Sequence, residues 1–286
     1  MSSRAVRVMT HRRPAQTGPA IQELLGAARD TGAVLRFDAE ETRKHGLSDN
    51  EGIELGLSED DGVELCVALG GDGTILTALR RYAGTGVPVF AVNFGEIGFL
   101  ATVDRDCGAE GFRRALAGEF EVMKLPGIEL RNDGGRWIAI NDIAIHRKPG
   151  NRVAELAYSI AGDEVGRVSC DGLVVATPAG STGYNLANGG PIMAWGVEGF
   201  VVSFIAPHSL TARALVVAPG DVLTVHNQSS EEPADATVDG RPACEIAAGG
   251  TLSVSFADCQ ALLAQLPGTS FYGRLREKFG RLASVR

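Results

Sequence analysis

The sequence predicts an α/β protein with two domains: a Rossmann-like N-terminal domain with a parallel sheet, and a β-rich, sandwich-like C-terminal domain. Up to about residue 124, apolar runs alternate with segments of helical periodicity, which is typical of a parallel sheet covered by helices. Beyond that point, many short apolar runs are separated by turn residues, which is typical of a β sandwich. We therefore expect domains at 1–124 and 125–258, and a C-terminal segment, 259–286, that returns to the N-terminal domain.

The first domain shows alternating strand and helix patterns. Expected strands are Ala5–Met9, Ala33–Phe37, Val63–Leu69 and Val87–Val92, and expected helices are Pro19–Asp30, Ile75–Tyr82 and Phe112–Leu116. The stretch Asp38–Asp61 is rich in acidic residues and glycine and has a weak apolar pattern, so we expect a mobile connection there. Because ligands of such sheets bind beyond the carboxyl ends of the strands, the glycine-bearing loops after Leu69 and Val92 lie at the predicted ligand edge.

The second domain carries short β-like runs. They are Ile128–Arg131, Trp137–His146, Ala154–Ala161, Glu164–Ser169, Leu173–Ala176, Phe200–Ile205, Val222–Val225, Ala236–Val238 and Leu252–Phe256. The tail returns to helical spacing over Ser270–Phe279, where Phe271, Leu275 and Phe279 share a face. This apolar face predicts that the tail helix packs back on the first domain.

Charge and cysteine content exclude several classes of protein. The net charge of −8 argues against a nucleic-acid or anionic-membrane surface, because both require a basic face. The five cysteines are scattered without a CxxC pair, so a disulfide framework or zinc site is not expected and a reducing, cytoplasmic location fits best. We expect no signal peptide in Met1–Arg13 and no membrane span, since no apolar run is long enough.

A glycine-rich turn at Gly70-Gly71-Asp72-Gly73-Thr74 lies between a predicted buried strand and a predicted helix. Its glycines allow close approach of a ligand, and the helix N-terminus favours an anion such as phosphate. A carboxylate beside phosphate is unfavourable unless it binds Mg²⁺ or takes a proton from an attacking hydroxyl. The alternative is that Asp72 only caps the helix.

Two further segments carry polar side chains suited to a ligand. The loop Thr177–Asn185 holds glycines, hydroxyl groups and Tyr184, which can stack on a base, although it could also be a hydrophilic turn. Asn141-Asp142 interrupts an apolar strand, and the pair could bind two ribose hydroxyls or only pin a bulge. Asp171 and Asp239-Gly240-Arg241 are weaker candidates, because each could be only a turn. The histidines are not clustered, and no metal site made of protein side chains is expected.

Together these segments resemble the NAD kinase family. The resemblance rests on Gly70–Thr74, Asn93-Phe94-Gly95 with Gly98-Phe99-Leu100, Asn141-Asp142, Asp171-Gly172, Thr177–Tyr184 with Gly189-Gly190-Pro191, and the tail Phe271–Phe279. The match covers nearly the whole chain after Val63. It implies transfer of the terminal phosphate of ATP, with Mg²⁺ or another divalent cation, to the 2′-hydroxyl of the adenosine ribose of NAD, giving NADP. It also implies a homo-oligomer, either a dimer or a tetramer, and a cleft between the two domains.

The resemblance also implies roles for individual residues. Asp72 is the expected catalytic base, and the remaining expected contacts with NAD or ATP are Gly71, Gly73, Thr74, Asn93, Asn141, Asp142, Arg152, Asp171, Thr182, Gly183, Tyr184, Asn185 and Ala187. Within this set, Asn141 and Asp142 are expected to hold ribose hydroxyls. Asp171 and Thr182 to Tyr184 are expected to hold the bases.

Three positions depart from the family pattern. Thr77 stands where many members carry Arg or Lys, Ala187 replaces a small hydroxyl residue, and Arg241 replaces the Gln or Asn that often follows Asp239-Gly240. None of them removes the base, so we expect activity with altered affinity. Two rival interpretations remain: a lipid kinase, which shares the first motif but needs an apolar or membrane-facing groove, and a nucleotide-binding regulator without catalysis.

Overall fold

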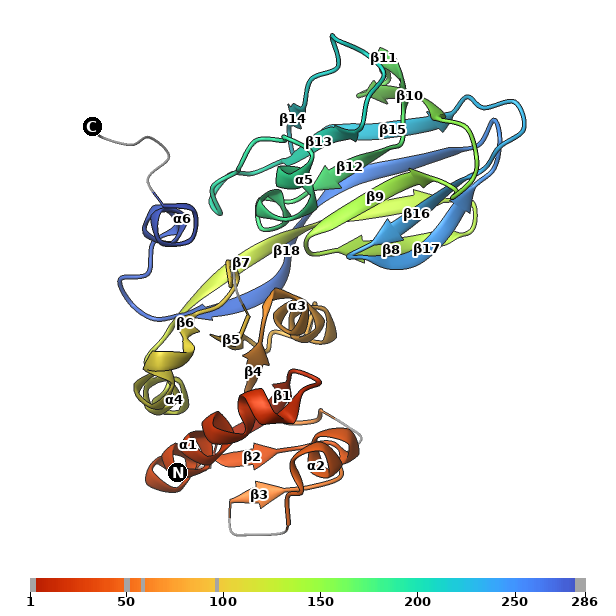
Figure 1. The fold of residues 1–286 in the computed structure, drawn as a ribbon. Coiled ribbons are helices and arrows are strands. Elements are labelled where there is room, and N and C mark those ends of the chain that lie inside the picture. Colours follow the sequence, from red (N-terminus) through yellow and green to blue (C-terminus); the bar gives the residue numbers. More distant parts are fainter. Residues whose placement is uncertain (1–3, 49–51, 58–59, 96–97, 281–286) are drawn as a thin grey trace. The chain divides into compact units, whose positions relative to one another are not determined.

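The computed structural model describes residues 4–48, 52–57, 60–95 and 98–280. The chain forms two compact units, Met1–Lys124 with Ala261–Arg286, and Leu125–Gln260 (Figure 1). Each unit has its own hydrophobic core. Across the described ranges, no helix combines the length and apolarity that crossing a membrane requires.

The first unit is built on a parallel sheet. Its strands are β1 (Ala5–Thr10), β2 (Val34–Arg36), β3 (Ile53–Glu54), β4 (Leu65–Gly70), β5 (Val89–Asn93), β6 (Val103–Asp104) and the last residues of β18 (Thr251–Gln265). The order β3-β2-β1-β4-β5 is parallel throughout, and β6 and β18 also pair in parallel with β5. This arrangement confirms the predicted Rossmann-like domain.

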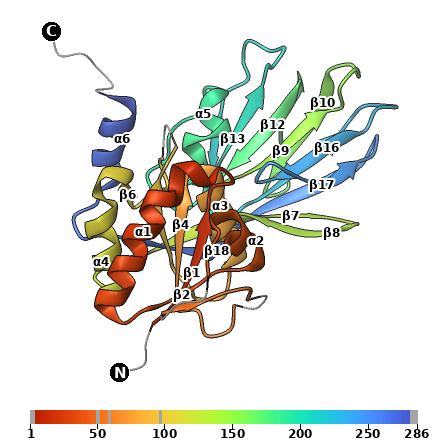
Figure 2. The same ribbon diagram turned by 60° about the horizontal axis from the view of Figure 1, so that its bottom comes forward.

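Helices cover this sheet on its two faces. The helices of this unit are α1 (Pro14–Thr31), α2 (Ala39–His45), α3 (Asp72–Arg81), α4 (Gly108–Ala117) and α6 (Phe271–Phe279), with the 3₁₀ turn η1 (Arg105–Cys107). Side chains of α1 and α4 share one core cluster with the strands, and the two helices lie side by side (Figure 2). The buried residues of α3 lie outside that cluster, because α3 covers the opposite face. Helix α1 begins at Pro14 rather than at the expected Pro19.

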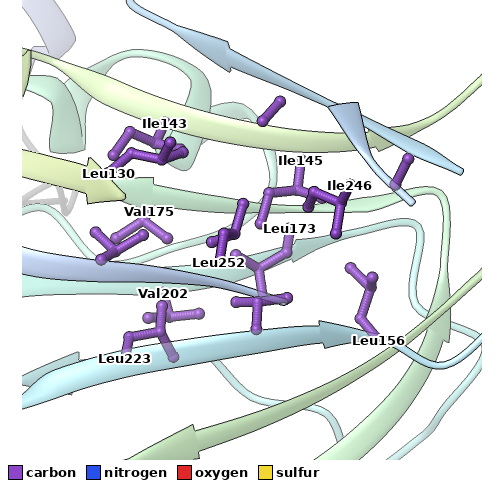
Figure 3. Packing of buried hydrophobic residues seen from close by; sticks show 14 of the residues in the cluster. Leu130, Ile143, Ile145, Leu156, Leu173, Val175, Val202, Leu223, Ile246 and Leu252 are labelled. Carbon is purple, nitrogen blue, oxygen red and sulfur yellow. The ribbon is translucent and has the colours of Figure 1, made fainter. Parts of the chain in front are cut away.

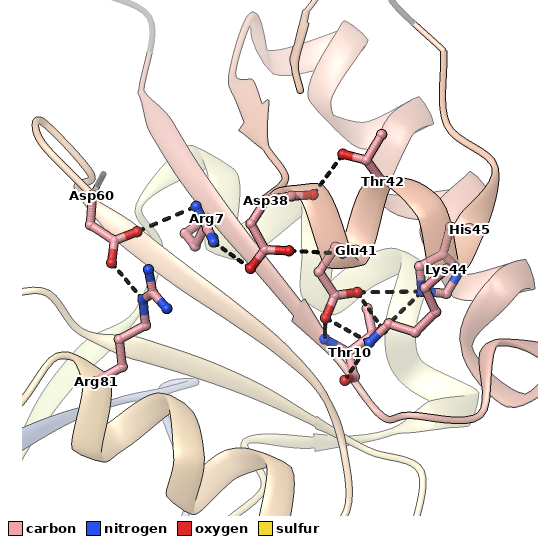
Figure 4. Close-up of polar contacts among 9 residues, drawn as sticks. All are labelled: Arg7, Thr10, Asp38, Glu41, Thr42, Lys44, His45, Asp60 and Arg81. Carbon is pink, nitrogen blue, oxygen red and sulfur yellow. Dashed lines mark hydrogen bonds and ion pairs between the residues drawn. The ribbon is translucent and has the colours of Figure 1, made fainter. Parts of the chain in front are cut away.

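The expectation of a mobile connection at Asp38–Asp61 is wrong for its first part, which forms α2. The Asp38 side chain caps this helix by accepting from Glu41 N at 2.8 Å. The buried Glu41 carboxylate accepts from Thr10 N at 2.8 Å and from Lys44 Nζ at 2.8 Å (Figure 4). Polar side chains attach α2 to β1, so apolar periodicity could not reveal it. Residues 49–51 and 58–59 of the same expected connection lie outside the described ranges.

The second unit consists mainly of antiparallel strands in two layers. One layer has the order β14-β13-β12-β9-β16-β17, and the other includes β11-β10-β15-β18 and the hairpin β7-β8. Their bounds are β7 (Glu121–Asn132), β8 (Gly135–Ala139), β9 (Asp142–Arg147), β10 (Ala154–Ile160), β11 (Asp163–Cys170), β12 (Gly172–Ala176), β13 (Phe200–Ile205), β14 (Leu215–Val217), β15 (Val222–Asn227), β16 (Ala234–Val238) and β17 (Arg241–Ile246). The predicted β-rich domain is therefore confirmed.

Alternating side chains of both layers form the core of this unit. Ile143 and Ile145 of β9 meet Leu223 of β15 and Leu252 of β18 in one buried cluster (Figure 3). Alternation arises because successive side chains of a strand point to opposite faces. The run expected as one strand, Trp137–His146, is instead two strands, because the chain leaves the ladder at Ile140 and Asn141. Strands β14 and β17 and the short helix α5 (Tyr184–Ala187) were not expected.

The tail helix α6 packs on the first unit, as its apolar face predicts. The rings of Phe271 and Phe279 each lie 5.7 Å from the ring of Phe99, measured between centroids. The Ser270 side chain caps the helix by accepting from Gly273 N at 3.0 Å. Lys278 Nζ is 3.0 Å from Asp104 Oδ1, so a salt bridge also holds the last turn.

Candidate functional site

The glycine-rich turn follows β4, and α3 begins directly at Asp72. The N-cap position belongs to Gly71, which has an extended backbone and no side-chain cap bond. The alternative that Asp72 serves as the helix cap is therefore wrong. A Cβ added to Gly70 would clash with the Thr74 side chain, so the absence of a side chain at Gly70 leaves room for the turn.

The Asp72 carboxylate binds backbone N–H groups of another loop. Its Oδ2 atom accepts from Phe99 N at 3.3 Å, and its Oδ1 atom accepts from Leu100 N at 3.1 Å. Both bonds are longer than the usual N–H···O distance of about 2.9 Å. A carboxylate has about four acceptor sites, so these two bonds orient the group and leave it able to accept a proton.

The loop after β5 lies against the glycine-rich turn. Strands β4 and β5 pair with Gly70 opposite Asn93, so both turns leave the sheet at the same edge, as the sequence predicts. Phe94 N donates to Gly70 O at 3.0 Å, and a Cβ on Gly95 would lie 3.0 Å from Gly71 Cα. The Asn93 side chain donates to Asp104 Oδ1 at 2.9 Å and accepts from Gly95 N at 2.9 Å, so it stabilises this loop. Glu96 and Ile97 lie outside the described ranges.

Helix α6 supports the same loop through Arg274, which sequence reasoning missed. The buried guanidinium donates to Phe99 O and to Thr102 O, each at 3.3 Å. The peptide unit between Phe99 and Leu100 thus bonds Arg274 through its carbonyl and Asp72 through its N–H. No local sequence signal marks this role, because Arg274 lies more than 170 positions along the chain from both acceptors.

In the second unit, Asn141 and Asp142 lie where the chain passes from β8 to β9. Thr177 N donates to Asn141 O at 2.9 Å, and Thr177 Oγ1 donates to Ile140 O at 2.7 Å, so the following loop is attached to this pair. Burial, and then the nearby charge of Asp239, raise the pKa of Asp142 to about 7. Its carboxyl group is therefore able to exchange a proton near neutral pH.

The loop Thr177–Ala187 divides into buried and exposed side chains. Ser181 Oγ accepts from Met193 N at 2.9 Å, and Asn185 Nδ2 donates to Ser181 O and to Pro191 O, both at 2.9 Å. These two side chains are buried and hold the loop in shape. Gly183, Tyr184 and Ala187 are exposed and Thr182 is partly exposed, so they present the surface on which a ligand could lie.

Tyr184 forms a flat aromatic surface with His146, a residue that sequence reasoning missed as part of this site. Their rings are 5.8 Å apart and inclined by only 22°. Burial lowers the pKa of His146, which favours a neutral ring beneath the phenol. Burial, and then the carboxylates of Asp142 and Asp171, raise the pKa of Tyr184, so these three predicted residues are brought together.

Asp171 pairs with a cation on the neighbouring strand, whereas Arg152 remains on the surface. Arg147 Nε lies 2.5 Å from Asp171 Oδ1, and Arg147 Nη1 donates to Asn151 O at 3.0 Å. Arg152 follows in the same loop, where its backbone N donates to Glu232 Oε2 at 3.0 Å and its side chain is exposed. The predicted residues therefore form two groups, one around Asp72 in the first unit and one around Tyr184 in the second.

Comparison with known proteins identifies the family. The ATP-NAD kinase N-terminal domain matches residues 30–120, and the ATP-NAD kinase C-terminal domain matches residues 140–266. An NAD kinase of Gemmatimonas aurantiaca is 37% identical over 221 residues, which cover 75% of this chain and 76% of that protein. An NAD kinase of Thermobifida fusca is 33% identical over 293 residues, covering 97% and 90%. The chain belongs to the ATP-NAD kinase family.

Solved structures of the family share the fold. The crystal structure of a yeast NADH kinase complexed with NADH has a TM-score of 0.87 at 22% identity, covering 100% of this chain and 90% of that one. The crystal structure of an NAD kinase from Archaeoglobus fulgidus in complex with ATP has a TM-score of 0.73 at 24% identity, covering 99% and 100%. The family resemblance inferred from the motifs is therefore confirmed, and the protein is a phosphotransferase of the ATP-NAD kinase family.

The described part of the first unit offers few side chains that could hold a metal ion. Among the residues with described positions, no group of three His, Cys, Asp or Glu side chains could hold a metal ion. The glycine-rich turn offers one carboxylate, Asp72, beside backbone N–H groups. One carboxylate cannot hold the ion by itself, so the turn fits an Mg²⁺ ion held mainly by substrate phosphates and water.

Proposed function

We propose that this member of the ATP-NAD kinase family transfers the terminal phosphate of ATP to the 2′-hydroxyl of the adenosine ribose of NAD, with Asp72 as the general base. The proposal rests on the surroundings of Asp72, the first residue of α3. Its carboxylate is oriented by two long hydrogen bonds from backbone N–H groups. A positioned carboxylate that keeps free lone pairs can take the proton from a hydroxyl as it attacks phosphorus. Phosphoryl transfer otherwise depends mainly on positioning and charge stabilisation.

The phosphates of ATP would bind at Gly71, Gly73 and Thr74. The backbone N–H groups at the start of α3 and its helix dipole favour negative charge there. A divalent cation, Mg²⁺ in the first instance, would neutralise phosphate charge when bound. The ion would be held mainly by the phosphates and by water, which leaves the Asp72 carboxylate free to act as the base.

The second group, around Tyr184, would bind NAD. Tyr184 offers an aromatic face, Thr182 a hydroxyl, and Asp142 and Asp171 carboxylates that can accept bonds from ribose or amide groups. Asn141 supports the ribose assignment, because its buried Oδ1 has no hydrogen-bond partner among the described residues. Asn93 and Asn185 would act by shaping their loops, since their side chains are bound to neighbouring groups. Ala187 would contribute only van der Waals contact.

An acceptor assay tests this function against its rivals. The purified protein is incubated with Mg-ATP and NAD, and NADP is measured; parallel reactions replace NAD with diacylglycerol or sphingosine. We expect NADP to form and no lipid to be phosphorylated. Phosphorylation of a lipid would favour the lipid kinase, and binding of NAD without any NADP would favour a regulator without catalysis.

We further propose that the protein works in the cytoplasm as a homo-oligomer, either a dimer or a tetramer. Strands β14 and β11 lie at the edges of their layers, where a second copy can add a strand. Several large apolar side chains of this unit are exposed, including Val165, Leu215 and Val216. Analytical ultracentrifugation at micromolar protein should show at least a dimer. A fully active monomer at that concentration would contradict the proposal.

A further inference from the structure

Asp239, on the turn between β16 and β17, makes contacts that its own turn does not require. Its side chain is buried and accepts three backbone hydrogen bonds, from Ile140 N to Oδ2 at 3.1 Å, from Asn141 N to Oδ1 at 2.8 Å and from Asp142 N to Oδ1 at 3.1 Å. In return, Asp239 N donates to Asp142 O at 2.8 Å. Its carboxylate thus accepts hydrogen bonds from the backbone N–H groups of three consecutive residues.

A purely local role does not account for these contacts. Asp239 and Gly240 both have positive φ, at 48° and 71°, and an Asp-Gly pair in this conformation is common in tight hairpin turns. An aspartate that only stabilises its turn would bond its own neighbouring backbone. The three donors instead lie 97 to 99 positions earlier in the chain.

The three N–H groups need this acceptor, because the chain has left the β ladder between β8 and β9. Strand β8 ends at Ala139 and β9 begins at Asp142, so Ile140 and Asn141 belong to neither strand. A buried N–H without a partner is costly, and a carboxylate accepts more strongly than a neutral group. The conformation of the break therefore depends on Asp239.

We propose that Asp239 is a positioning residue that holds Asn141 and Asp142 in the conformation in which they bind the ribose hydroxyls of NAD. The inference rests on the proposed function of that pair. Asp239 does not touch substrate in this account, because its carboxylate faces the backbone of residues 140–142.

Electrostatics give the proposal a second consequence. Among the described residues, Asp239, from the β16–β17 turn, and Tyr184, from α5, interact electrostatically with the Asp142 carboxyl. The paired strand β12 carries no charged side chain, and Asp235 of the other paired strand, β16, lies opposite His146. Burial and the charge of Asp239 raise the pKa of Asp142 to about 7. Removing the Asp239 charge should lower that pKa, so Asp142 would stay ionised in more acidic solution.

Two substitutions separate position from charge. Asp239→Asn removes the charge and places an amide donor among three donors, whereas Asp239→Glu keeps the charge and displaces it by one methylene group. Asp133→Asn is the matched control, since Asp133 precedes a glycine in the β7–β8 hairpin turn and is exposed. We expect KM for NAD to rise roughly ten- to a hundredfold in both Asp239 variants, with KM for ATP and the control unchanged.

The pH dependence of kcat/KM for NAD and amide hydrogen exchange complete the test. The acidic limb should move to lower pH in Asp239→Asn but stay in place in Asp239→Glu, and residues 140–142 should exchange faster in both without ligand. If Asp142→Asn raises KM for NAD while folded Asp239 variants leave KM, pH limb and exchange unchanged, the inference is wrong. If Asp142→Asn itself leaves KM for NAD unchanged, the ribose assignment fails instead. Should Asp239→Asn not fold, Asp239→Glu decides the positioning claim through KM and exchange.

Discussion

Two aspartates of this protein bind backbone N–H groups, yet their surroundings differ. Asp72, in the first unit, is only partly buried and accepts two bonds of 3.1 and 3.3 Å. Asp239, in the second unit, is 9% exposed and accepts three bonds, the shortest 2.8 Å. The Asp72 carboxylate is oriented but still accessible to solvent. The Asp239 carboxylate is buried, and its oxygens already accept backbone hydrogen bonds.

The difference in burial and hydrogen bonding between Asp72 and Asp239 fits a group that takes part in the reaction and one that holds the backbone in place. A base must gain and lose a proton in each turnover, so it needs lone pairs that the fold does not fully use. A buried carboxylate with three charge-assisted bonds would lose them on protonation, and therefore serves to fix its donors. Substitutions at the two positions should accordingly act on different kinetic constants.

The largest effect should come from removing the divalent cation. ATP brings negative charge that the acidic turn at Asp72 cannot neutralise, so chelation of Mg²⁺ should abolish turnover, and added Mg²⁺ should restore it. The melting temperature should hardly change, because the described residues hold no cluster of metal ligands. A steep loss of thermal stability on chelation would instead reveal a structural ion.

Next in size is Asp72→Asn, which keeps the shape and removes the basic oxygen. We expect kcat to fall by about 10²–10⁴-fold, with KM for NAD nearly unchanged, since general-base help has this magnitude. This is the opposite pattern to that expected of Asp239→Asn. A thermal melt establishes folding, and Thr77→Ala is the control on the same helix, because Thr77 Oγ1 donates to Gly73 O within α3 itself. Near-normal kcat in a folded Asp72→Asn protein would remove Asp72 from the chemistry.

The sequence predicts those parts of the fold and site that depend on residues close together in the chain. Glycines around Asp72 and the apolar run before them indicate a strand, a turn and an anion-binding helix start within a few residues. The roles of Asp239 and Arg274 depend on partners about 100 and more than 170 positions away, and no local periodicity reports such contacts. Helix α2 escaped prediction for a related reason, because polar bonds from Glu41 rather than an apolar stripe attach it to β1.

A smaller effect is expected from Tyr184→Ala in the second unit. The phenol ring is 37% exposed and stacks on His146, so its removal takes away a face on which a base could lie. Stacking of a base is worth roughly 1–3 kcal/mol, which corresponds to roughly a 5- to 150-fold weaker affinity for NAD. Affinity for ATP should change much less, because its phosphates are assigned to the Asp72 turn.

Tyr272→Ala serves as the control for that variant, since Tyr272 is 71% exposed on α6 in the other unit. A melt is needed beside the titration, because the Tyr184 ring also packs against His146. If a stable Tyr184→Ala protein binds NAD as tightly as the unsubstituted protein, the exposed face of this loop does not contact NAD.

The smallest effect should follow Arg152→Ala. The Arg152 side chain is exposed, and Arg147 attaches its loop to the site by bonding Asn151 O and Asp171. A solvent-exposed charge contact contributes about 0.2–1 kcal/mol, so NAD should bind only about 1.5- to 5-fold more weakly. Ionic strength decides whether the contribution of Arg152 to NAD binding is electrostatic. At 1 M salt the Debye length is about 3 Å, and the difference between the two proteins should vanish. A loss of NAD affinity larger than tenfold, or one that persists in high salt, would show that Arg152 helps to position the site, as proposed for Asp239. It would then be more than a solvent-exposed charge contact.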